Sequence, residues 1–161
     1  KAVPLRPPKR RKRDCFGCEY GMIRPDDTIL VINGDVLTNL DFRALMSYHR
    51  DNQAELTMVV QQYNIQLPYG VVECEGTLVS NLAEKPTKNF LVNAGIYLLE
   101  PSVYRFIPSG QRFDMTDLIN RLLTEARPVA GFPITEYWLD VGDQADYERA
   151  IQDVKDWTQA S

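Results

Sequence analysis

The chain contains little histidine and cysteine, with one His and three Cys among 161 residues. Because an odd number of cysteines cannot all pair, a secreted fold held by disulfides is not expected. A reducing, cytoplasmic environment is expected instead. No apolar run approaches the ~20 residues that cross a bilayer, and no signal peptide opens the sequence, so no membrane partner is expected. The composition, 44% hydrophobic and 25% charged, is that of one ordinary globular domain with its own core.

Charge is unevenly distributed along the chain. Residues 1–13 hold seven of the 18 basic side chains and none of the 22 acidic ones, so the rest of the chain carries a net charge of −11. An acidic body does not attract nucleic acid by counterion release, and no nucleic-acid partner is expected. The basic, Pro-rich head, residues 1–22, lacks apolar periodicity and is typical of a tail, although such a segment can also bind an anionic surface.

The head also contains the pair Cys15 and Cys18, which has the spacing of half a zinc site. The other soft ligands of the chain are Cys74 and the single His49, and a tetrahedral site would need both to meet this pair. A thioredoxin-like redox pair would follow a strand, and no strand pattern precedes Cys15. The sequence therefore favours neither a zinc site nor a redox centre.

From about residue 26 onward, strand and helix patterns alternate. Strands are predicted at 28–33, 55–63, 71–74 with a second piece after the turn at Gly76, 90–99, 129–133 and 137–142. Helices are predicted from a cap at Asn39 or Asp41 to about residue 52, and at 101–106, 114–127 and 144–157. The apolar run at 28–33 is typical of a strand buried on both faces. His49 shares a helix face with Leu45, which favours a histidine at the edge of the core over a catalytic one. The pattern predicts a three-layer α/β domain with a mixed, largely parallel sheet over residues 23–161.

Two aspartates follow predicted strands. Asp35 comes after the run at 28–33, next to Gly34, and Asp140 ends the strand that begins at residue 137. Ligands of open α/β sheets bind beyond the carboxyl ends of the strands, and two carboxylates there could hold Mg²⁺ together with substrate phosphates. The alternative interpretation is that each aspartate only caps a helix or makes a turn.

Two short motifs carry further polar groups. Glu84-Lys85-Pro86 places a hydrogen-bond acceptor beside a cation, a combination that suits a sugar phosphate but is also common on surfaces. Asn93-Ala94-Gly95 interrupts an apolar strand with the polar side-chain amide of Asn93 and with Gly95, which has no side chain. Such a gap indicates either close approach by a ligand or another backbone, or a β-bulge.

Taken in order, the motifs form a more specific pattern. They are Asn33-Gly34-Asp35, Pro68-Tyr69-Gly70-Val71, Glu84-Lys85-Pro86, Asn93-Ala94-Gly95-Ile96-Tyr97 and Trp138-Leu139-Asp140-Val141-Gly142. This series resembles the sugar nucleotidyltransferases, or NDP-sugar pyrophosphorylases, over residues 25–155. The resemblance implies a Rossmann-like α/β/α fold and a Mg²⁺-dependent reaction of a nucleoside triphosphate with a sugar 1-phosphate, giving NDP-sugar and pyrophosphate.

The resemblance also implies roles for individual residues. Asp35 and Asp140 would hold the metal and, with Lys85, form the catalytic set. The sugar phosphate would be bound by Gly70, Glu84, Lys85 and Asn93. In this set Glu84 accepts hydrogen bonds from sugar hydroxyls and Lys85 contacts the phosphate. Positioning and charge neutralisation suffice for joining two phosphates, so no Ser-His or Cys-His nucleophile is expected.

One feature departs from the family pattern. The family carries a Gly-x-Gly-Thr-Arg loop near its amino terminus that wraps the triphosphate, and no such motif precedes Asp26. We therefore hypothesise that residues 1–22 are non-native sequence joined to a carboxyl-terminal portion of the family fold, which is then incomplete at its amino end.

Three functional hypotheses follow. The first is a nucleotidyltransferase, crippled in this chain by the missing loop, and the second is a non-catalytic sugar-phosphate-binding or regulatory subunit of the same fold. A glycosyltransferase ranks last, because Asn33-Gly34-Asp35 offers only one carboxylate of the usual Asp-x-Asp metal site. Uncovered sheet edges would also favour a homo-oligomer.

Overall fold

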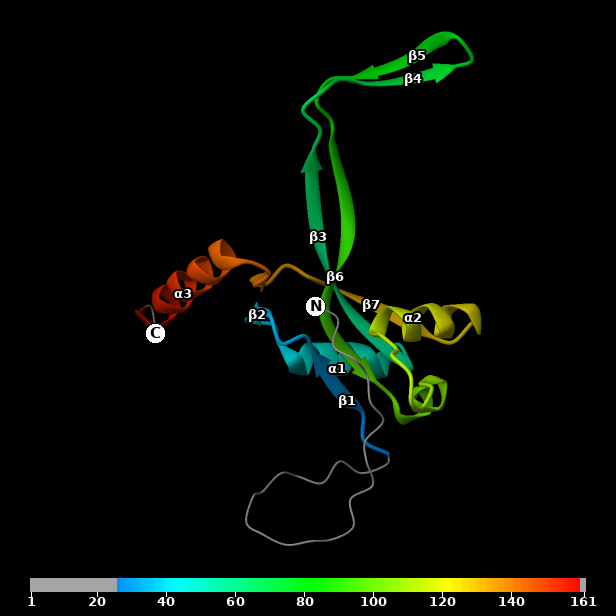
Figure 1. Cartoon of the computed structure of the whole chain (residues 1–161), viewed down its shortest axis with the longest axis vertical. Coiled ribbons are helices and arrows are strands. Elements are labelled where there is room, and N and C mark those ends of the chain that lie inside the picture. Colours follow the sequence, from blue (N-terminus) through cyan, green and yellow to red (C-terminus); the bar gives the residue numbers. More distant parts are fainter. Residues whose placement is uncertain (1–25, 160–161) are drawn as a thin grey trace, which may run out of the picture.

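The structure is a computed structural model that describes residues 26–159 (Figure 1). The basic head over residues 1–22, with Cys15 and Cys18, lies outside the described residues. In chain order the elements are β1 (Ile29–Ile32), β2 (Val36–Thr38), α1 (Phe42–Asp51), β3 (Leu56–Gln66), β4 (Val71–Glu75), β5 (Leu78–Ala83), β6 (Thr87–Leu99), the 3-10 helix η1 (Pro101–Phe106), α2 (Met115–Thr124), β7 (Val129–Ile134), β8 (Trp138–Asp140) and α3 (Gln144–Gln159). No helix within 26–159 is long and apolar enough to cross a membrane.

The main sheet has four strands in the order β1-β6-β3-β7. Strand β6 runs antiparallel to both β1 and β3, and within residues 26–159 only β3 and β7 pair in parallel. The sheet is mixed, as expected, but the prediction that it is largely parallel was wrong. The chain returns from β3 to β6 through the hairpin β4–β5, without the crossover helix that a parallel pair needs, whereas η1 and α2 lie between β6 and β7 and allow β7 to run parallel to β3.

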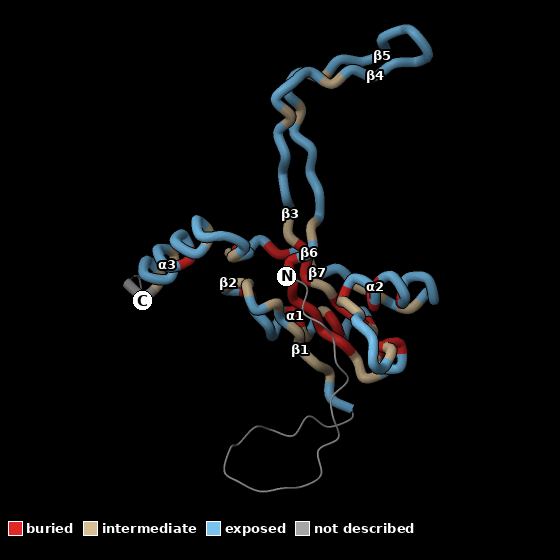
Figure 2. The backbone as a smooth tube through the Cα atoms, viewed as in Figure 1, coloured by how far each residue is buried: buried red, intermediate tan, exposed pale blue. Residues whose placement is uncertain are grey.

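Helices cover both faces of this sheet, which confirms an α/β fold. Alternate residues of β6 point to opposite faces, so Tyr97 and Leu99 pack with η1 and α2, while Ile96 and Leu98 pack with α1. The burial map shows both cores concentrated where the strands cross the middle of the molecule (Figure 2).

Helix α1 carries the expected core histidine. Asp41 caps its first turn by accepting hydrogen bonds from the amides of Arg43 and Ala44. His49 is 1% exposed, and its ring bonds to Thr57 Oγ1 at 2.7 Å and Glu100 Oε1 at 2.9 Å. Both ring nitrogens are engaged inside the core, which confirms the structural interpretation of this residue.

Strand β1 differs from its expected environment. Leu30 and Ile32 are 42% and 39% exposed, whereas Val31 on the opposite face packs against the core. Among residues 26–159 no strand pairs with the outer edge of β1, and one of its faces is uncovered. The prediction that residues 28–33 are buried on both faces was therefore wrong for this part of the chain.

Strands β3 and β6 extend far beyond the sheet (Figure 1). Strand β7 pairs with β3 only as far as Gln61, but β3 and β6 stay paired with each other to Gln66 opposite Thr87. The hairpin β4–β5 continues from the end of this ribbon. We call residues 61–92 the arm; nearly all of it is exposed (Figure 2).

Candidate functional site

Two aspartates lie on neighbouring backbone segments where β2 and β8 pair. Asp35 lies in the turn between β1 and β2, and Asp140 is the last residue of β8. The two strands are antiparallel with Val36 opposite Asp140, and the amide of Val141 donates to the carbonyl of Asp35 at 2.7 Å. The backbone segments that carry the two carboxylates are therefore direct neighbours, although they lie more than 100 residues apart in the sequence.

The Asn-Ala-Gly motif of β6 lies against the same two segments. The amide of Asn33 donates to the carbonyl of Gly95 at 2.8 Å, and the indole nitrogen of Trp138 donates to the carbonyl of Ala94 at 2.8 Å. Gly95 has φ of +74°, and a Cβ added there would lie 2.6 Å from Asn33 Nδ2. Only glycine fits, because both the backbone conformation and the close side chain exclude a larger residue. We call this arrangement the clamp.

The same motif forms a bulge in the sheet. The register between β3 and β6 shifts where Met58 faces Tyr97 and Val60 faces Asn93. The side chain of Asn93 bonds within β6, accepting from the amide of Gly95 at 3.0 Å and donating to the hydroxyl of Tyr97 at 2.7 Å. The bulge alternative is therefore observed, and the close approach at Gly95 comes from another segment of the chain.

Tyr97 beside this bulge is a perturbed phenol. Burial raises its pKa above the ordinary value, and the hydrogen bond from Asn93 partly offsets that effect. The phenol therefore stays protonated at neutral pH and fixes the side chain of Asn93. The clamp and this hydrogen bond tie Asn93 to the part of the sheet that carries Asp35 and Asp140.

The other predicted residues gather on the arm. Gly70 precedes β4 and lies opposite the end of β5, where a Cβ added to it would be 3.1 Å from Glu84 Oε2. Lys85 follows with a left-handed backbone, φ of 44°, which turns the chain into β6. All three residues are exposed, so the acceptor, the cation and the open glycine backbone face solvent together.

The structure does not bring these two groups into one site. Asn93 lies at the base of the arm and Thr87 at the far end of its ribbon, six residues along β6, or about 20 Å at the usual rise of a strand. Glu84 and Lys85 lie beyond that end. In this chain, Asp35, Asp140 and Asn93 belong to the end of the sheet, and Gly70, Glu84 and Lys85 to the arm.

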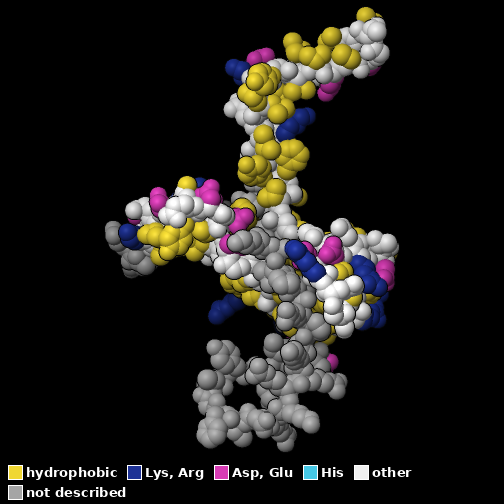
Figure 3. Space-filling model, in the orientation of Figure 1, with side chains coloured by type: hydrophobic (Ala, Val, Ile, Leu, Met, Phe, Trp, Pro, Cys, Tyr) yellow, Lys and Arg dark blue, Asp and Glu magenta, His cyan; other side chains and the backbone are white. Residues whose placement is uncertain are grey.

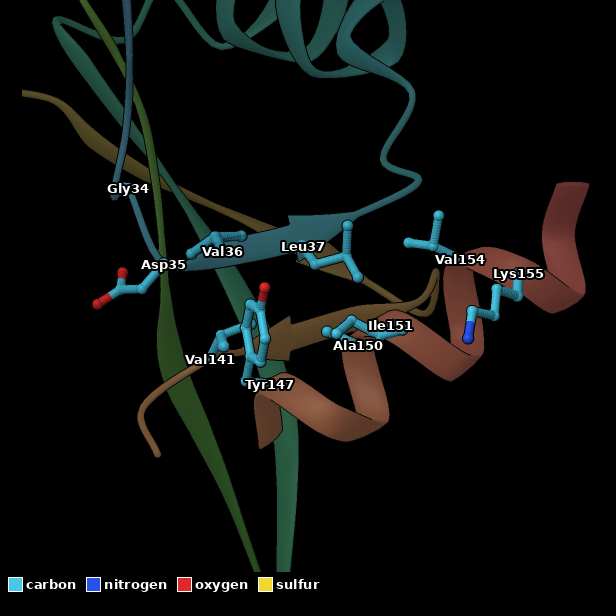
Figure 4. A pocket seen from close by; sticks show the side chains of 10 residues that line it. All are labelled: Gly34, Asp35, Val36, Leu37, Val141, Tyr147, Ala150, Ile151, Val154 and Lys155. Carbon is cyan, nitrogen blue, oxygen red and sulfur yellow. The ribbon is translucent and has the colours of Figure 1, made fainter. Parts of the chain in front are cut away.

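An apolar groove, which the sequence analysis did not identify, lies between β2 and α3 (Figure 4). It encloses about 580 Å³ and is lined by Gly34, Asp35, Val36, Leu37, Val141, Tyr147, Ala150, Ile151, Val154 and Lys155. Asp35 stands at one end and Lys155 at the other, with apolar side chains between them. The signal was visible as apolar residues at helical spacing in 144–157, but that spacing alone does not distinguish a groove wall from a core face.

The donor set at the sheet end suits a hard cation only in part. Within residues 26–159 no three His, Cys, Asp or Glu side chains gather where they could share a metal ion. Asp35 and Asp140 would supply two carboxylates, the number with which Mg²⁺ is commonly held when substrate phosphates and waters complete its shell. The residues present fit a shared protein–substrate metal site and not an all-protein one.

Comparison with known proteins identifies the family. The model of the family described as Nucleotidyl transferase matches residues 12–156. The chain belongs to the nucleotidyl transferase family. It is 34% identical over 137 residues to UTP–glucose-1-phosphate uridylyltransferase of Synechocystis, covering 80% of this chain and 35% of that protein. It is 28% identical to mannose-1-phosphate guanylyltransferase of Mycobacterium tuberculosis, with coverages of 80% and 37%.

Solved structures of nucleotidyl transferases share the fold. A putative glucose-1-phosphate thymidylyltransferase from Bacillus anthracis superposes with a TM-score of 0.55 at 22% identity, covering 78% of this chain and 53% of that one. A UTP-bound UGPase from Acinetobacter baumannii gives a TM-score of 0.55 at 19% identity, with coverages of 80% and 51%. The chain spans about a third of the length of its curated relatives and about half of the solved structures.

Proposed function

We propose that this chain carries the acceptor half of a sugar-1-phosphate nucleotidyltransferase site. In that reaction a phosphate oxygen of the sugar 1-phosphate attacks the α-phosphorus of a nucleoside triphosphate, the bond between the α-phosphorus and its bridging oxygen breaks, and pyrophosphate leaves. The observation that supports this most directly is that the backbone segments carrying Asp35 and Asp140 are neighbours at the paired ends of β2 and β8, held by the clamp. The names of the relatives, which act on glucose 1-phosphate and mannose 1-phosphate, agree with it.

Asp35 and Asp140 would hold Mg²⁺, which when bound supplies a Lewis acid and a template for the phosphates. The chain's own contribution there is to carry the two carboxylates on neighbouring backbone segments. Because β2 and β8 are joined by backbone hydrogen bonds, the backbone beneath the two side chains is already in place when substrate phosphates arrive.

The arm would recognise the sugar. Glu84 would accept hydrogen bonds from sugar hydroxyls, and the missing side chain of Gly70 lets the Glu84 carboxylate lie close to the backbone there. Lys85 would neutralise the phosphate as a point charge. Asn93, at the base of the arm, would contribute an amide once its bond to Tyr97 is exchanged for one to the substrate.

A second candidate is a sugar-phosphate-binding subunit without turnover. It is favoured by one observation: Gly70, Glu84 and Lys85 lie together on the arm, beyond the ~20 Å of ribbon that leads away from Asn93. An arm in this position binds a sugar phosphate without presenting it to the two aspartates.

Two measurements on the 161-residue chain distinguish the candidates. Pyrophosphate release would be followed with a panel of nucleoside triphosphates and hexose 1-phosphates, in Mg²⁺ and in EDTA. Binding of each sugar phosphate alone would be measured by calorimetry. Mg²⁺-dependent release supports the transferase, binding without release supports the subunit, and neither binding nor release contradicts both.

A further inference from the structure

The turn that carries Asp35 brings a second amide side chain to the clamp. Asn33 lies opposite Gly95, because its backbone amide donates to the Gly95 carbonyl and the preceding residue, Ile32, pairs with Ile96. The three atoms nearest to a Cβ added at Gly95 all belong to the Asn33 side chain, at 2.6 to 3.2 Å. The side chain of Asn33 therefore packs over the bare backbone of Gly95.

This packing places Asn33 on the face of the sheet that carries Tyr97. Val31 is opposite Tyr97 in the register of β1 and β6, and opposed residues of an antiparallel pair share a face. Asn33 follows Val31 by two residues, and side chains two apart along a strand point to the same face. The hydroxyl of Tyr97 accepts a hydrogen bond from Asn93. Asn33 and Asn93 are therefore two amides on one face of adjoining strands.

The two amides differ in their hydrogen bonds. The side chain of Asn93 accepts from Gly95 and donates to Tyr97, so both of its ends are engaged. Among residues 26–159 the side-chain amide of Asn33 has no hydrogen-bond partner, although the residue is half-buried. Withdrawing a polar group from water without a partner is unfavourable, and leucine would fill the same space without that cost. The amide of Asn33 is therefore open to a ligand.

The packing also determines which end of this amide is offered. Nδ2 of Asn33 is the atom nearest to the position of a Gly95 Cβ, at 2.6 Å, and Cγ and Cβ of Asn33 follow. The nitrogen end therefore rests against β6, and Oδ1 lies farther from it. An amide oxygen accepts hydrogen bonds from hydroxyls, whereas ionised phosphate oxygens are themselves acceptors. The open end of Asn33 therefore suits a hydroxyl.

The charge near this turn agrees with a neutral ligand group. Asp140, Asp143 and Asp146 are exposed between the end of β8 and the first turn of α3. Figure 3 shows acidic side chains over α3 and beside its connection to the main sheet. These carboxylates repel an anion that arrives without a cation, but they do not repel a hydroxyl.

We propose that Asn33 is a further substrate-binding residue, whose Oδ1 accepts a hydrogen bond from a hydroxyl of the hexose or of the nucleotide ribose. The inference rests on the function proposed above, in which Asp35 of the same turn lies beside the substrate phosphates. Asn33 offers its acceptor without rearrangement, whereas a contribution from Asn93 requires its bond to Tyr97 to be exchanged.

Ligand binding to variants of the 161-residue chain tests this assignment. Asn33→Leu keeps the branched shape beside Gly95 and removes the amide. Calorimetry in Mg²⁺ with glucose 1-phosphate, mannose 1-phosphate and a nucleoside triphosphate should show about tenfold weaker binding of the ligand whose hydroxyl Asn33 holds. A loss confined to the hexose phosphates identifies the hexose, and a loss confined to the nucleotide identifies the ribose.

The matched control is Asn39→Leu. Asn39 is exposed just beyond β2, and within the described part of the chain its side chain has no hydrogen-bond partner. The same substitution there should leave every affinity within about twofold of wild type.

Ligands that lack single hydroxyls give a second readout. Removing the hydroxyl that bonds to Asn33 should weaken binding to wild type about tenfold. The same analogue and its parent should bind Asn33→Leu equally well, because the partner of that hydroxyl is already gone. Independent losses from the analogue and from the variant would contradict a direct bond.

Folding is checked by urea denaturation. The midpoint of Asn33→Leu should stay close to that of wild type, because the amide that it loses has no partner among the described residues. A large fall in the midpoint would show a packing role and overturn the proposal. If wild type binds a substrate and Asn33→Leu binds it equally well, or if Asn39→Leu loses as much, the role of Asn33 is overturned and the proposed function stands. A wild-type chain that binds neither kind of ligand overturns both.

Discussion

Asp140 is the residue whose proposed role is easiest to isolate. It is exposed at the end of β8, so Asp140→Asn changes charge without opening the core. We expect at least ~100-fold slower Mg²⁺-dependent pyrophosphate release, if the chain turns over, and weaker binding of Mn²⁺ in the presence of sugar phosphate. Electron paramagnetic resonance of free Mn²⁺ measures the second effect even without turnover.

The control for that substitution is Glu148→Gln. Glu148 is also exposed, and its described hydrogen bond is to Gln144 within α3. Equal losses in the two variants would indicate a general electrostatic effect and would contradict a specific role for Asp140.

Gly95 makes the clamp possible. A side chain there would combine a left-handed backbone with a contact of 2.6 Å to Asn33, so Gly95→Ala should cost about 2 kcal/mol or more of the free energy of unfolding. Gly34→Ala, next to Asn33 of the clamp, meets nothing within 4 Å and should change stability by less than ~0.5 kcal/mol. Urea denaturation of both variants measures the difference, and equal stabilities would show that the close contact relaxes without cost.

Among the elements, α3 is joined to the rest of the fold by few contacts. Tyr137, which precedes β8, donates a hydrogen bond to Asp153 of α3 and packs edge-on against Trp157 with ring centroids 4.8 Å apart. Desolvation, reinforced by the hydrogen bond to Asp153 and by its charge, raises the pKa of Tyr137 to about 12. The attachment of α3 therefore depends on a neutral phenol.

This raised pKa predicts a stability loss at alkaline pH. Unfolded tyrosine has a pKa of 10.0, so above that pH the unfolded state loses its proton first and becomes favoured. The contribution of Tyr137 is complete below pH 10 and is lost as the pH rises toward about 12. The melting temperature of wild type should fall more steeply over this interval than that of Tyr137→Phe. Tyr69→Phe, on the exposed arm, should follow wild type, and parallel curves for all three proteins would contradict the prediction.

Local patterns predicted most of the elements but not their neighbours. Three local signals were followed by the expected structure, because each depends on residues close together in the sequence. Asp41 caps a helix, Gly76 forms the turn of a hairpin, and the apolar stripe of 114–127 forms a helix. Which strand lies beside which is decided by contacts far apart in the sequence. For this reason the apolar run at 28–33 predicted burial on both faces, whereas Leu30 is exposed at a sheet edge.

The candidate site shows the same division. Asp35 and Asp140 were predicted at strand ends, and pairing of β2 with β8 makes those ends neighbours. The short strand β2 itself was not predicted, because three residues carry no usable periodicity. The roles of Gly70, Glu84, Lys85 and Asn93 stay predictions.

At the scale of the whole molecule, the body and the arm should differ in local stability. Residues of β3 up to Gln61 have partner strands on both sides, and those beyond it have only β6. Amide hydrogen exchange in dilute solution should be at least ~100-fold slower over Leu56–Val60 than over Gln62–Gln66. Mass spectrometry of the exchanged peptides resolves the two segments. Similar rates would mean that the arm is held by contacts absent from the isolated chain.

The continuous pairing of β3 and β6 also restricts how this region can change during evolution. Adding one residue to both strands would turn everything beyond it onto the opposite face, whereas adding two to both would keep every face and lengthen the ribbon by about 7 Å. Lineages that vary here should therefore differ by even numbers of residues in each strand. Where a single-residue difference occurs in both strands, the apolar and polar positions of the hairpin should have exchanged places.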